Sequence, residues 1–173
     1  MSKNLSKFMS LVLRHKPKSI GIILDKNGWV PLNRLVLQLN KNGFECTPEQ
    51  VKDVVTNDTK TRYTIRDGKI RANQGHSIGI DLGLTPETPP DVLYHGSNIS
   101  AYESILTKGI YKMKRDHVHL SSNIDIALEV GARRGKPVLI TIDTKKMFND
   151  GKQFFLSENG VWLTDNISKE YFI

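Results

Sequence analysis

The amino-acid sequence predicts an α+β protein built from two domains, with mostly antiparallel strands in the second. Segments with helical spacing of apolar residues alternate with short strand-like runs along the 173 residues. The stretch Pro86–Pro90 contains three prolines in five residues, which is the composition of a stiff connector. We therefore expect one domain in residues 1–85 and a second in residues 91–173.

Net charge differs between the two halves of the chain. Residues 1–85 hold 14 Lys and Arg against 7 Asp and Glu, whereas residues 86–173 hold 11 of each kind. A net charge of +7 confined to one half predicts a polyanionic partner for that half, and nucleic acid is the commonest such partner. A basic domain that is merely soluble would show the same asymmetry.

The composition argues against several classes of protein. No apolar run approaches the ~20 residues that a membrane span needs. The N-terminal residues Met1–Asn4 show no secretory signal pattern, and the single Cys46 has no partner for an internal disulfide or a zinc site. We expect a cytoplasmic protein without membrane contact.

Three helices are predicted in residues 1–85. The first carries apolar residues at helical spacing and ends before Pro17, because proline cannot continue a helix. The second begins at Pro31 and ends near Gly43. The third begins at Thr47-Pro48-Glu49-Gln50, a capping box with proline at the first helical position.

Strand signals surround these helices. Trp29-Val30 follows the turn residues Asp25–Gly28, and a hairpin is predicted for Tyr63–Ile65 and Lys69–Arg71 around Asp67-Gly68. Three helices followed by a basic hairpin is the order of a winged helix. Because the third helix is acidic, we expect the hairpin and the end of the first helix to contact nucleic acid.

The second half alternates short strands and helices, which predicts a compact α+β domain. Strands are predicted at Val92–Tyr94 (broken by Gly96 and Ser97), Val118–Leu120, Pro137–Ile142, Phe154–Leu156 and Val161–Leu163, with Tyr171–Ile173 as an edge strand. Helices are predicted at Ala101–Lys108, ended by Gly109, and at Ile126–Arg133, capped by Ser121 or Ser122.

Several familiar binding motifs are missing from the sequence. No G-x-G-x-x-G follows a strand, and Gly131–Pro137 lacks the spacing and the hydroxyl residue of a phosphate-binding loop. His117 and His119 share one face of a predicted strand, but no ligand spacing matches a known metal site. We therefore expect neither a Rossmann dinucleotide site nor a bound metal.

Phosphate-compatible side chains stand at the ends of predicted elements. Arg14 and His15 close the first helix, where cations commonly compensate the negative end of the helix dipole. The alternative is that Arg14 supplies a planar fork for two phosphate oxygens and His15 a further donor. The polar stretch Arg71–Ser77 can offer donors to an anion, although a plain loop has the same composition. The other arginines at such ends are Arg62, Arg71 and Arg115.

A set of short blocks runs nearly from end to end of the chain. The blocks are Ser6–Phe8, Leu13–Pro17, Asp25–Trp29, Arg71–Ser77, Pro89-Pro90 with Leu93–Gly96, Val118–Ser121, Val130–Arg133 and Asn159–Thr164. Together and in this order they resemble the NAD-dependent RNA 2′-phosphotransferases. Two positions depart slightly from that family, since Ser97 stands where threonine is common and Asn73 lies at a variable position.

The resemblance implies a winged-helix RNA-binding lobe in residues 1–85 and an ADP-ribosyltransferase-like lobe in residues 91–173 that binds NAD as a co-substrate. It implies a catalytic set of Arg14, His15, Arg62 and Arg115. It places NAD against Tyr94, His95, Gly96, Ser97, His119, Leu120 and Ser121, with Arg133 as a further candidate. We expect the RNA phosphate to contact Arg71, His76 and Ser77.

The reaction that the resemblance implies has two steps. An internal RNA 2′-phosphate attacks C1″ of the nicotinamide ribose and expels nicotinamide, which leaves an ADP-ribosylated 2′-phosphate. The 2″-hydroxyl then attacks phosphorus, giving 2′-hydroxyl RNA and ADP-ribose 1″,2″-cyclic phosphate. The first nucleophile is already an anion, so Val161 can stand where protein-modifying ADP-ribosyltransferases place a glutamate. Fixed Arg and His donors suit the second step, which gathers charge on a transferring phosphoryl group.

The expected partner is RNA with an internal 2′-phosphate, such as a tRNA splice junction, and the expected assembly is a monomer. Two alternatives stay open. An ADP-ribosyltransferase that acts on nucleic-acid terminal phosphates or on protein would use the same pocket and leave a stable adduct. A non-catalytic winged-helix nucleic-acid-binding protein fits the charge asymmetry but gives the histidines of the second half no role.

Overall fold

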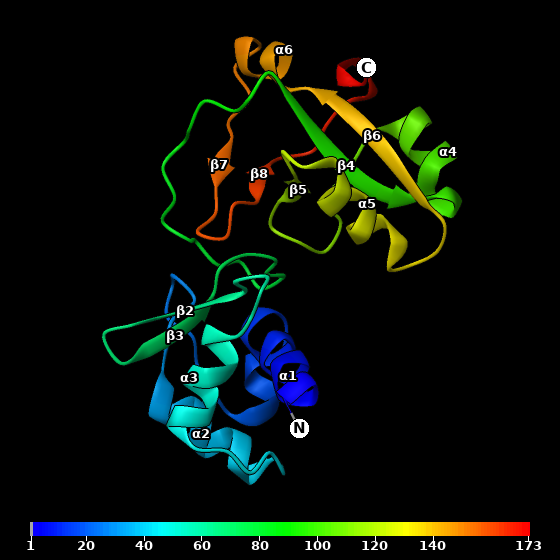
Figure 1. Cartoon of the computed structure of the whole chain (residues 1–173). Coiled ribbons are helices and arrows are strands. Elements are labelled where there is room, and N and C mark those ends of the chain that lie inside the picture. Colours follow the sequence, from blue (N-terminus) through cyan, green and yellow to red (C-terminus); the bar gives the residue numbers. More distant parts are fainter. Residues whose placement is uncertain (1) are drawn as a thin grey trace. The chain divides into compact units, whose positions relative to one another are not determined.

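The computed structural model describes residues 2–173, which fold into two compact units (Figure 1). The first unit ends at Gly83 and the second is Leu84–Ile173. Both units combine helices with antiparallel strand pairs, so the α+β class predicted from the sequence is confirmed. No helix among the described residues has both the length and the apolar character that crossing a bilayer requires.

The helices of the first unit surround one apolar core. They are α1 (Ser2–Arg14), the 3₁₀ helix η1 (Pro17–Ile20), α2 (Leu32–Lys41) and α3 (Pro48–Thr56). Met9, Leu35 and Val51, one from each α-helix, are 0% exposed in this core. The predicted capping box at α3 is confirmed, because Thr47 accepts from the Gln50 backbone while the Gln50 side chain accepts from Thr47.

The strands of the first unit form one antiparallel sheet in the order β1 (Val30–Pro31), β3 (Lys69–Ala72), β2 (Tyr63–Arg66). The predicted hairpin is confirmed: Asp67 and Gly68 take positive φ angles of 49° and 71° between β2 and β3. Two such residues make the turn whose twist matches a two-stranded ribbon. The strand predicted at Trp29-Val30 is shifted by one residue, since Val30 and Pro31 are the residues that pair with β3.

The second unit contains two antiparallel sheets. One pairs β4 (Val92–Asn98) with β6 (Pro137–Asp143) along their full lengths. The other has the order β5 (Val118–Leu120), β8 (Trp162–Thr164), β7 (Phe155–Leu156). Tyr94 and Ser121 join β4 to the segment after β5 by two backbone hydrogen bonds of 2.8 and 2.9 Å. This bridge brings together two groups of residues that the sequence singled out.

Four helical segments complete the second unit: α4 (Ile99–Lys108), α5 (Ile124–Ala132), α6 (Thr144–Asn149) and the 3₁₀ helix η2 (Lys169–Tyr171). In Figure 1, α5 lies across the strands β4 and β6. The helix α6 was not predicted, because six residues are too few to show a helical period.

Gly96 and Ser97 do not break β4, so that prediction was wrong. The strand continues through both residues and pairs with Leu139 and Val138. Glycine is needed at position 96 for packing, since a Cβ atom there would lie 1.6 Å from the carbonyl oxygen of Ala127 in α5. A missing side chain in a strand can therefore mark the close approach of another backbone.

Two further predictions for the second unit need correction. The cap of α5 is Asn123, whose side chain accepts from the Ile126 backbone, whereas the Ser121 hydroxyl donates to the Asn123 carbonyl. The tail is not an edge strand: it forms η2 and then makes an isolated bridge between Phe172 and Ile142. Antiparallel pairing in the rest of the unit is as predicted.

Candidate active site

In the first unit, the end of α1 is fastened to the loop that follows β3. The Ser77 backbone N–H donates to the Arg14 carbonyl at 3.0 Å, and His15 Nδ1 lies 2.9 Å from the Ser77 hydroxyl. Gly75 lies beside the Arg14 side chain, since a Cβ atom at Gly75 would make an ordinary van der Waals contact of 3.8 Å with the guanidinium carbon. Arg14 and His15 therefore lie close to Ser77, although 62 residues separate His15 from Ser77 in the sequence. All three residues are half-buried.

Arg71 belongs to β3, just before this loop in the sequence, and is only 6% exposed. Its guanidinium stacks on the Trp29 ring at 4.7 Å from the centroid. Its Nη1 donates to the carbonyls of Asn27 and Leu82 at 3.4 and 3.2 Å. The arginine therefore ties the β3 strand to two loops, and direct contact with RNA stays a prediction for this residue.

His76 is also buried, with 2% of its surface exposed. Its Nε2 atom is buried and has no hydrogen-bond partner among the residues that the structure describes. Burial lowers the pKa of His76 to about 4, and the nearby charges of Arg14, His15 and Arg71 act in the same direction. The imidazole is therefore neutral at physiological pH and lies among cations without adding to their charge.

The lowered pKa of His76 predicts that the first unit loses stability in mild acid. The folded state holds this pKa near 4 while an unfolded histidine titrates near 6.5, so the unfolded state binds more protons between these values. The free energy of unfolding should fall by roughly 3 kcal/mol as the pH drops from about 6.5 to 4, and this contribution is fully present above 6.5. Denaturant titrations of the wild type and of His76→Gln test this, and equal pH slopes for the two proteins would contradict it.

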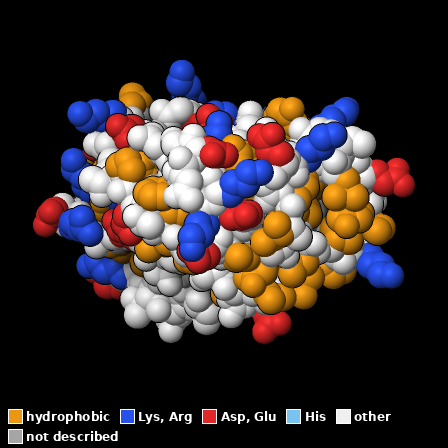
Figure 2. Space-filling model, turned by 90° about the horizontal axis from the view of Figure 1, so that it is seen from above, with side chains coloured by type: hydrophobic (Ala, Val, Ile, Leu, Met, Phe, Trp, Pro, Cys, Tyr) orange, Lys and Arg blue, Asp and Glu red, His pale blue; other side chains and the backbone are white. Residues whose placement is uncertain are grey.

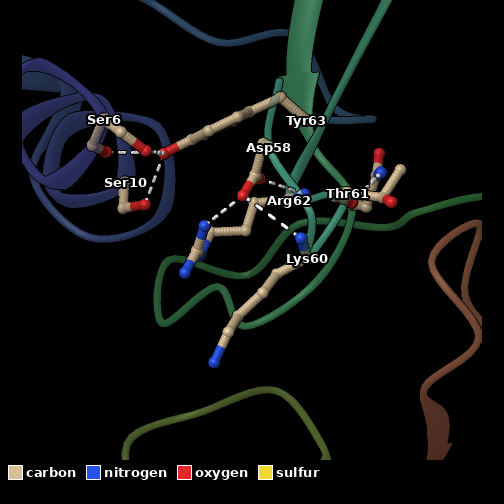
Figure 3. Close-up of polar contacts among 8 residues, drawn as sticks. Ser6, Ser10, Asp58, Lys60, Thr61, Arg62 and Tyr63 are labelled. Atoms are coloured by element: carbon tan, nitrogen blue, oxygen red, sulfur yellow. Dashed lines mark hydrogen bonds and ion pairs between the residues drawn. The ribbon is translucent and has the colours of Figure 1, made fainter. Parts of the chain in front are cut away.

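Arg62 precedes β2 and forms an ion pair with the buried carboxylate of Asp58, whose side chain is 5% exposed (Figure 3). The same carboxylate accepts from the backbone N–H groups of Arg62 and Lys60 at 2.7 and 3.3 Å. The backbone carbonyl of Arg62 accepts from Asn73 at 2.9 Å, which links it to the loop beside Arg14. Asp58 was not among the predicted site residues, although its place four residues before Arg62 was a usable signal.

In the second unit, the predicted residues of β4 and β5 meet around two histidines. His95 Nδ1 lies 3.1 Å from the His119 carbonyl, so this nitrogen must carry the proton and donate it. Burial lowers the pKa of His95, against the opposing effect of that hydrogen bond, which favours the neutral imidazole. Arg115 Nη1 lies 2.9 Å from His119 Nδ1, which accepts because a guanidinium can only donate.

Arg115 lies among other cations. Burial lowers its pKa, and the charges of Arg134 and then Arg133 lower it further. Like charges held together favour binding of an anion, which would relieve their repulsion. On the face shown in Figure 2, Lys and Arg side chains are interspersed with acidic and apolar ones. Arg134 was not among the predicted site residues.

The remaining predicted residues of the second unit differ in exposure. Tyr94, Ser97 and Ser121 are half-buried, as expected for groups that can reach a ligand. Leu120 is 2% exposed and belongs to the apolar core. His117, which shares a face with His119, packs edge-on against Phe155 at 5.9 Å. Among residues 2–173, no three His, Cys, Asp or Glu side chains come together as metal ligands would.

Comparison with known proteins gives a consistent result over the whole chain. A family model described as RNA 2′-phosphotransferase, Tpt1 / KptA family, matches residues 1–166. Proteins named "Probable RNA 2'-phosphotransferase" from Acaryochloris marina and Flavobacterium johnsoniae are each 45% identical over 173 residues, covering 99% of this chain and 96% and 95% of theirs. One of the same name from Rhizobium leguminosarum bv. trifolii is 42% identical over 172 residues, covering 99% of this chain and 93% of its own. The chain therefore belongs to the RNA 2′-phosphotransferase, Tpt1 / KptA family, whose members are NAD-using enzymes that remove a 2′-phosphate from RNA.

Proposed function

We propose that the chain removes an internal 2′-phosphate from RNA with residues of both units, Arg14, His15 and Arg62 in the first and Arg115 in the second. The observation that carries this proposal is the fastening of Arg14 and His15 to the loop that ends in Ser77. Side chains held in this way are pre-organised donors for a phosphate, which is how transferring phosphoryl groups are stabilised. Within this scheme, the finer fold assignments are also proposals: a winged-helix lobe that binds RNA, and an ADP-ribosyltransferase-like lobe.

Arg14 and His15 have complementary roles in this proposal. Arg14 offers a planar fork to two phosphate oxygens, and His15 donates from the ring nitrogen that does not face Ser77. Ser77 adds a hydroxyl at the same place. With Ser77, the buried residues Arg71 and His76 complete the set that we assign to the RNA phosphate.

Arg62 is held by Asp58, which fixes the direction of its guanidinium. One face of the fork is occupied by the carboxylate, and the remaining donors of a guanidinium can serve a second anion. An arginine oriented in this way loses less side-chain entropy when the phosphate binds. We therefore assign Arg62 to orienting the phosphate before reaction.

The polar side chains of the second unit are chemically suited to bind NAD. NAD supplies the ribose that accepts the phosphate once nicotinamide has left, so that the phosphate ends as ADP-ribose 1″,2″-cyclic phosphate. Arg115, Arg133 and Arg134 suit anionic phosphate groups, and the neutral His95 keeps Nε2 available as an acceptor for a hydroxyl. The residues we assign to NAD are Tyr94, His95, Gly96, Ser97, His119, Leu120, Ser121 and Arg133, with Gly96 and Leu120 acting through packing.

Product analysis tests the proposal directly. Incubation with NAD and a short RNA that carries one internal 2′-phosphate should release one nicotinamide and one ADP-ribose 1″,2″-cyclic phosphate for each 2′-hydroxyl RNA formed. A stable ADP-ribose adduct on RNA or protein would instead identify an ADP-ribosyltransferase. Binding of RNA without release of nicotinamide would identify a non-catalytic RNA-binding protein. A tRNA splice junction is the natural substrate that we propose, and a monomer is the active form.

A further inference from the structure

A groove of about 1100 Å³ opens on the first unit, away from Arg14 and His15, neither of which lines it. It lies between α1 and α3, with Ser6 and Ser10 on one side and Asp53 and Asn57 on the other. We call it the α1–α3 groove. Arg62 and Asp58 form part of its wall, so the groove begins at a residue that we have assigned to the phosphate.

Tyr63 holds the two serines that line the groove on the α1 side. The Tyr63 hydroxyl donates to the Ser6 carbonyl at 2.6 Å and lies 2.5 Å from the Ser10 hydroxyl, as Figure 3 shows. Phe44, which also lines the groove, stacks on Phe8 with 4.3 Å between ring centroids and is half-buried. The lining therefore offers both hydroxyl groups and part of an aromatic ring.

Charge in the groove is opposite to that of the unit around it. Three of the seven acidic residues in residues 1–85 line it, Glu45, Asp53 and Asp58, against two cations, Lys7 and Arg62. Asp58 is paired with Arg62, whereas Glu45 and Asp53 are exposed. Exposed carboxylates repel phosphate but accept hydrogen bonds from the amino groups of nucleobases.

Resting on the proposed function, we propose that the α1–α3 groove binds the base of the nucleotide next to the 2′-phosphate in the RNA. A phosphate at Arg62 leaves the adjoining nucleoside at the mouth of the groove, whose volume is ample for a base and its ribose. Proteins bind an unstacked base by stacking it on an aromatic face and by hydrogen bonds from polar groups to its edge, and the groove provides both kinds of group. A basic peptide could also pair with the carboxylates. It would not, however, account for the cationic Arg62 at the end of the groove.

The test compares two substrates of equal charge. One is a trinucleotide with a 2′-phosphate on its central ribose, and the other has abasic riboses on both sides of that centre. For the wild type, loss of the neighbouring bases should raise the KM about tenfold, with a much smaller change in kcat. Substrates abasic on only the 5′ side or only the 3′ side then show which neighbour the groove holds.

Thr59→Trp narrows the groove, since Thr59 is exposed and lines it. In this variant the ratio of the KM values for the two substrates should fall toward one. The matched control is Thr56→Trp, at the exposed end of α3 and outside the groove lining, which should keep the wild-type ratio. Glu45→Gln with Asp53→Asn tests the edge contacts without adding bulk, and should weaken a preference for cytosine or adenine over uracil as the neighbour.

The outcomes separate the two proposals. Equal KM values for the two substrates in the wild type, with normal products, would overturn the groove proposal and leave the proposed function intact. Formation of no product from either substrate would overturn both. An unchanged KM ratio in Thr59→Trp, in a protein whose melting temperature matches that of the wild type, would also overturn the groove proposal and would leave the groove to a ligand other than RNA.

Discussion

Replacing Arg14 by alanine should stall the reaction after the RNA has been joined to ADP-ribose. The first step begins with a phosphate that is already an anion, whereas the second gathers charge on the transferring phosphoryl group and depends on fixed donors. Loss of one such donor typically lowers the rate ~10²–10³-fold. Single-turnover reactions with labelled RNA should therefore show ADP-ribosylated RNA accumulating in the variant and remaining transient in the wild type.

Arg115→Ala should trap the same species, because we assign Arg115 to the same step from the second unit. Its loss also removes the donor to His119, so a small effect on nicotinamide release is expected in addition. Arg34→Ala is a suitable control, since Arg34 is an exposed arginine of α2 and should react as the wild type does. Wild-type single-turnover kinetics in both Arg14→Ala and Arg115→Ala would show that the roles are wrongly assigned.

Gly96→Ala should strongly destabilise the second unit, although it adds only one methyl group. The added Cβ would lie 1.6 Å from the Ala127 carbonyl oxygen and 3.1 Å from the Gly131 backbone nitrogen, and backbone atoms of a helix cannot turn aside as a flexible side chain can. The helix α5 must therefore move away from β4, and overpacking of this kind costs ~3 kcal/mol or more of the free energy of unfolding.

Tryptophan fluorescence can show in which unit the stability is lost, because Trp29 lies in the first unit and Trp162 in the second. In a Trp29→Phe background, the denaturant midpoint reported by Trp162 should fall sharply for Gly96→Ala. Ser97→Ala, one residue further along the same strand, is the matched control and should change the free energy of unfolding by less than about 1 kcal/mol. A Gly96→Ala protein that unfolds at the wild-type midpoint would show that α5 does not press on β4 as the structure indicates.

Local chemistry explains which elements were predictable. Pro17 and the Thr47–Gln50 capping box set helix ends by interactions within four residues, and the Asp67-Gly68 turn sets the hairpin in the same way. The predictions that failed depend on partners far along the chain. The residue type of Gly96 predicts a break in the strand, but its role depends on Ala127 and Gly131, which approach it from α5.

The same distinction between local and distant interactions applies to the candidate site. The family, the unequal charge of the two halves and the residue types suited to a phosphate can be recognised along the chain, because they are properties of composition and of short motifs. The contact of Ser77 with His15, the pairing of Asp58 with Arg62 and the burial of Arg71 and His76 became known with the fold. The reason is physical: burial and pairing depend on which distant segments pack together, and a motif read along one chain carries no information on what lies beside it in space.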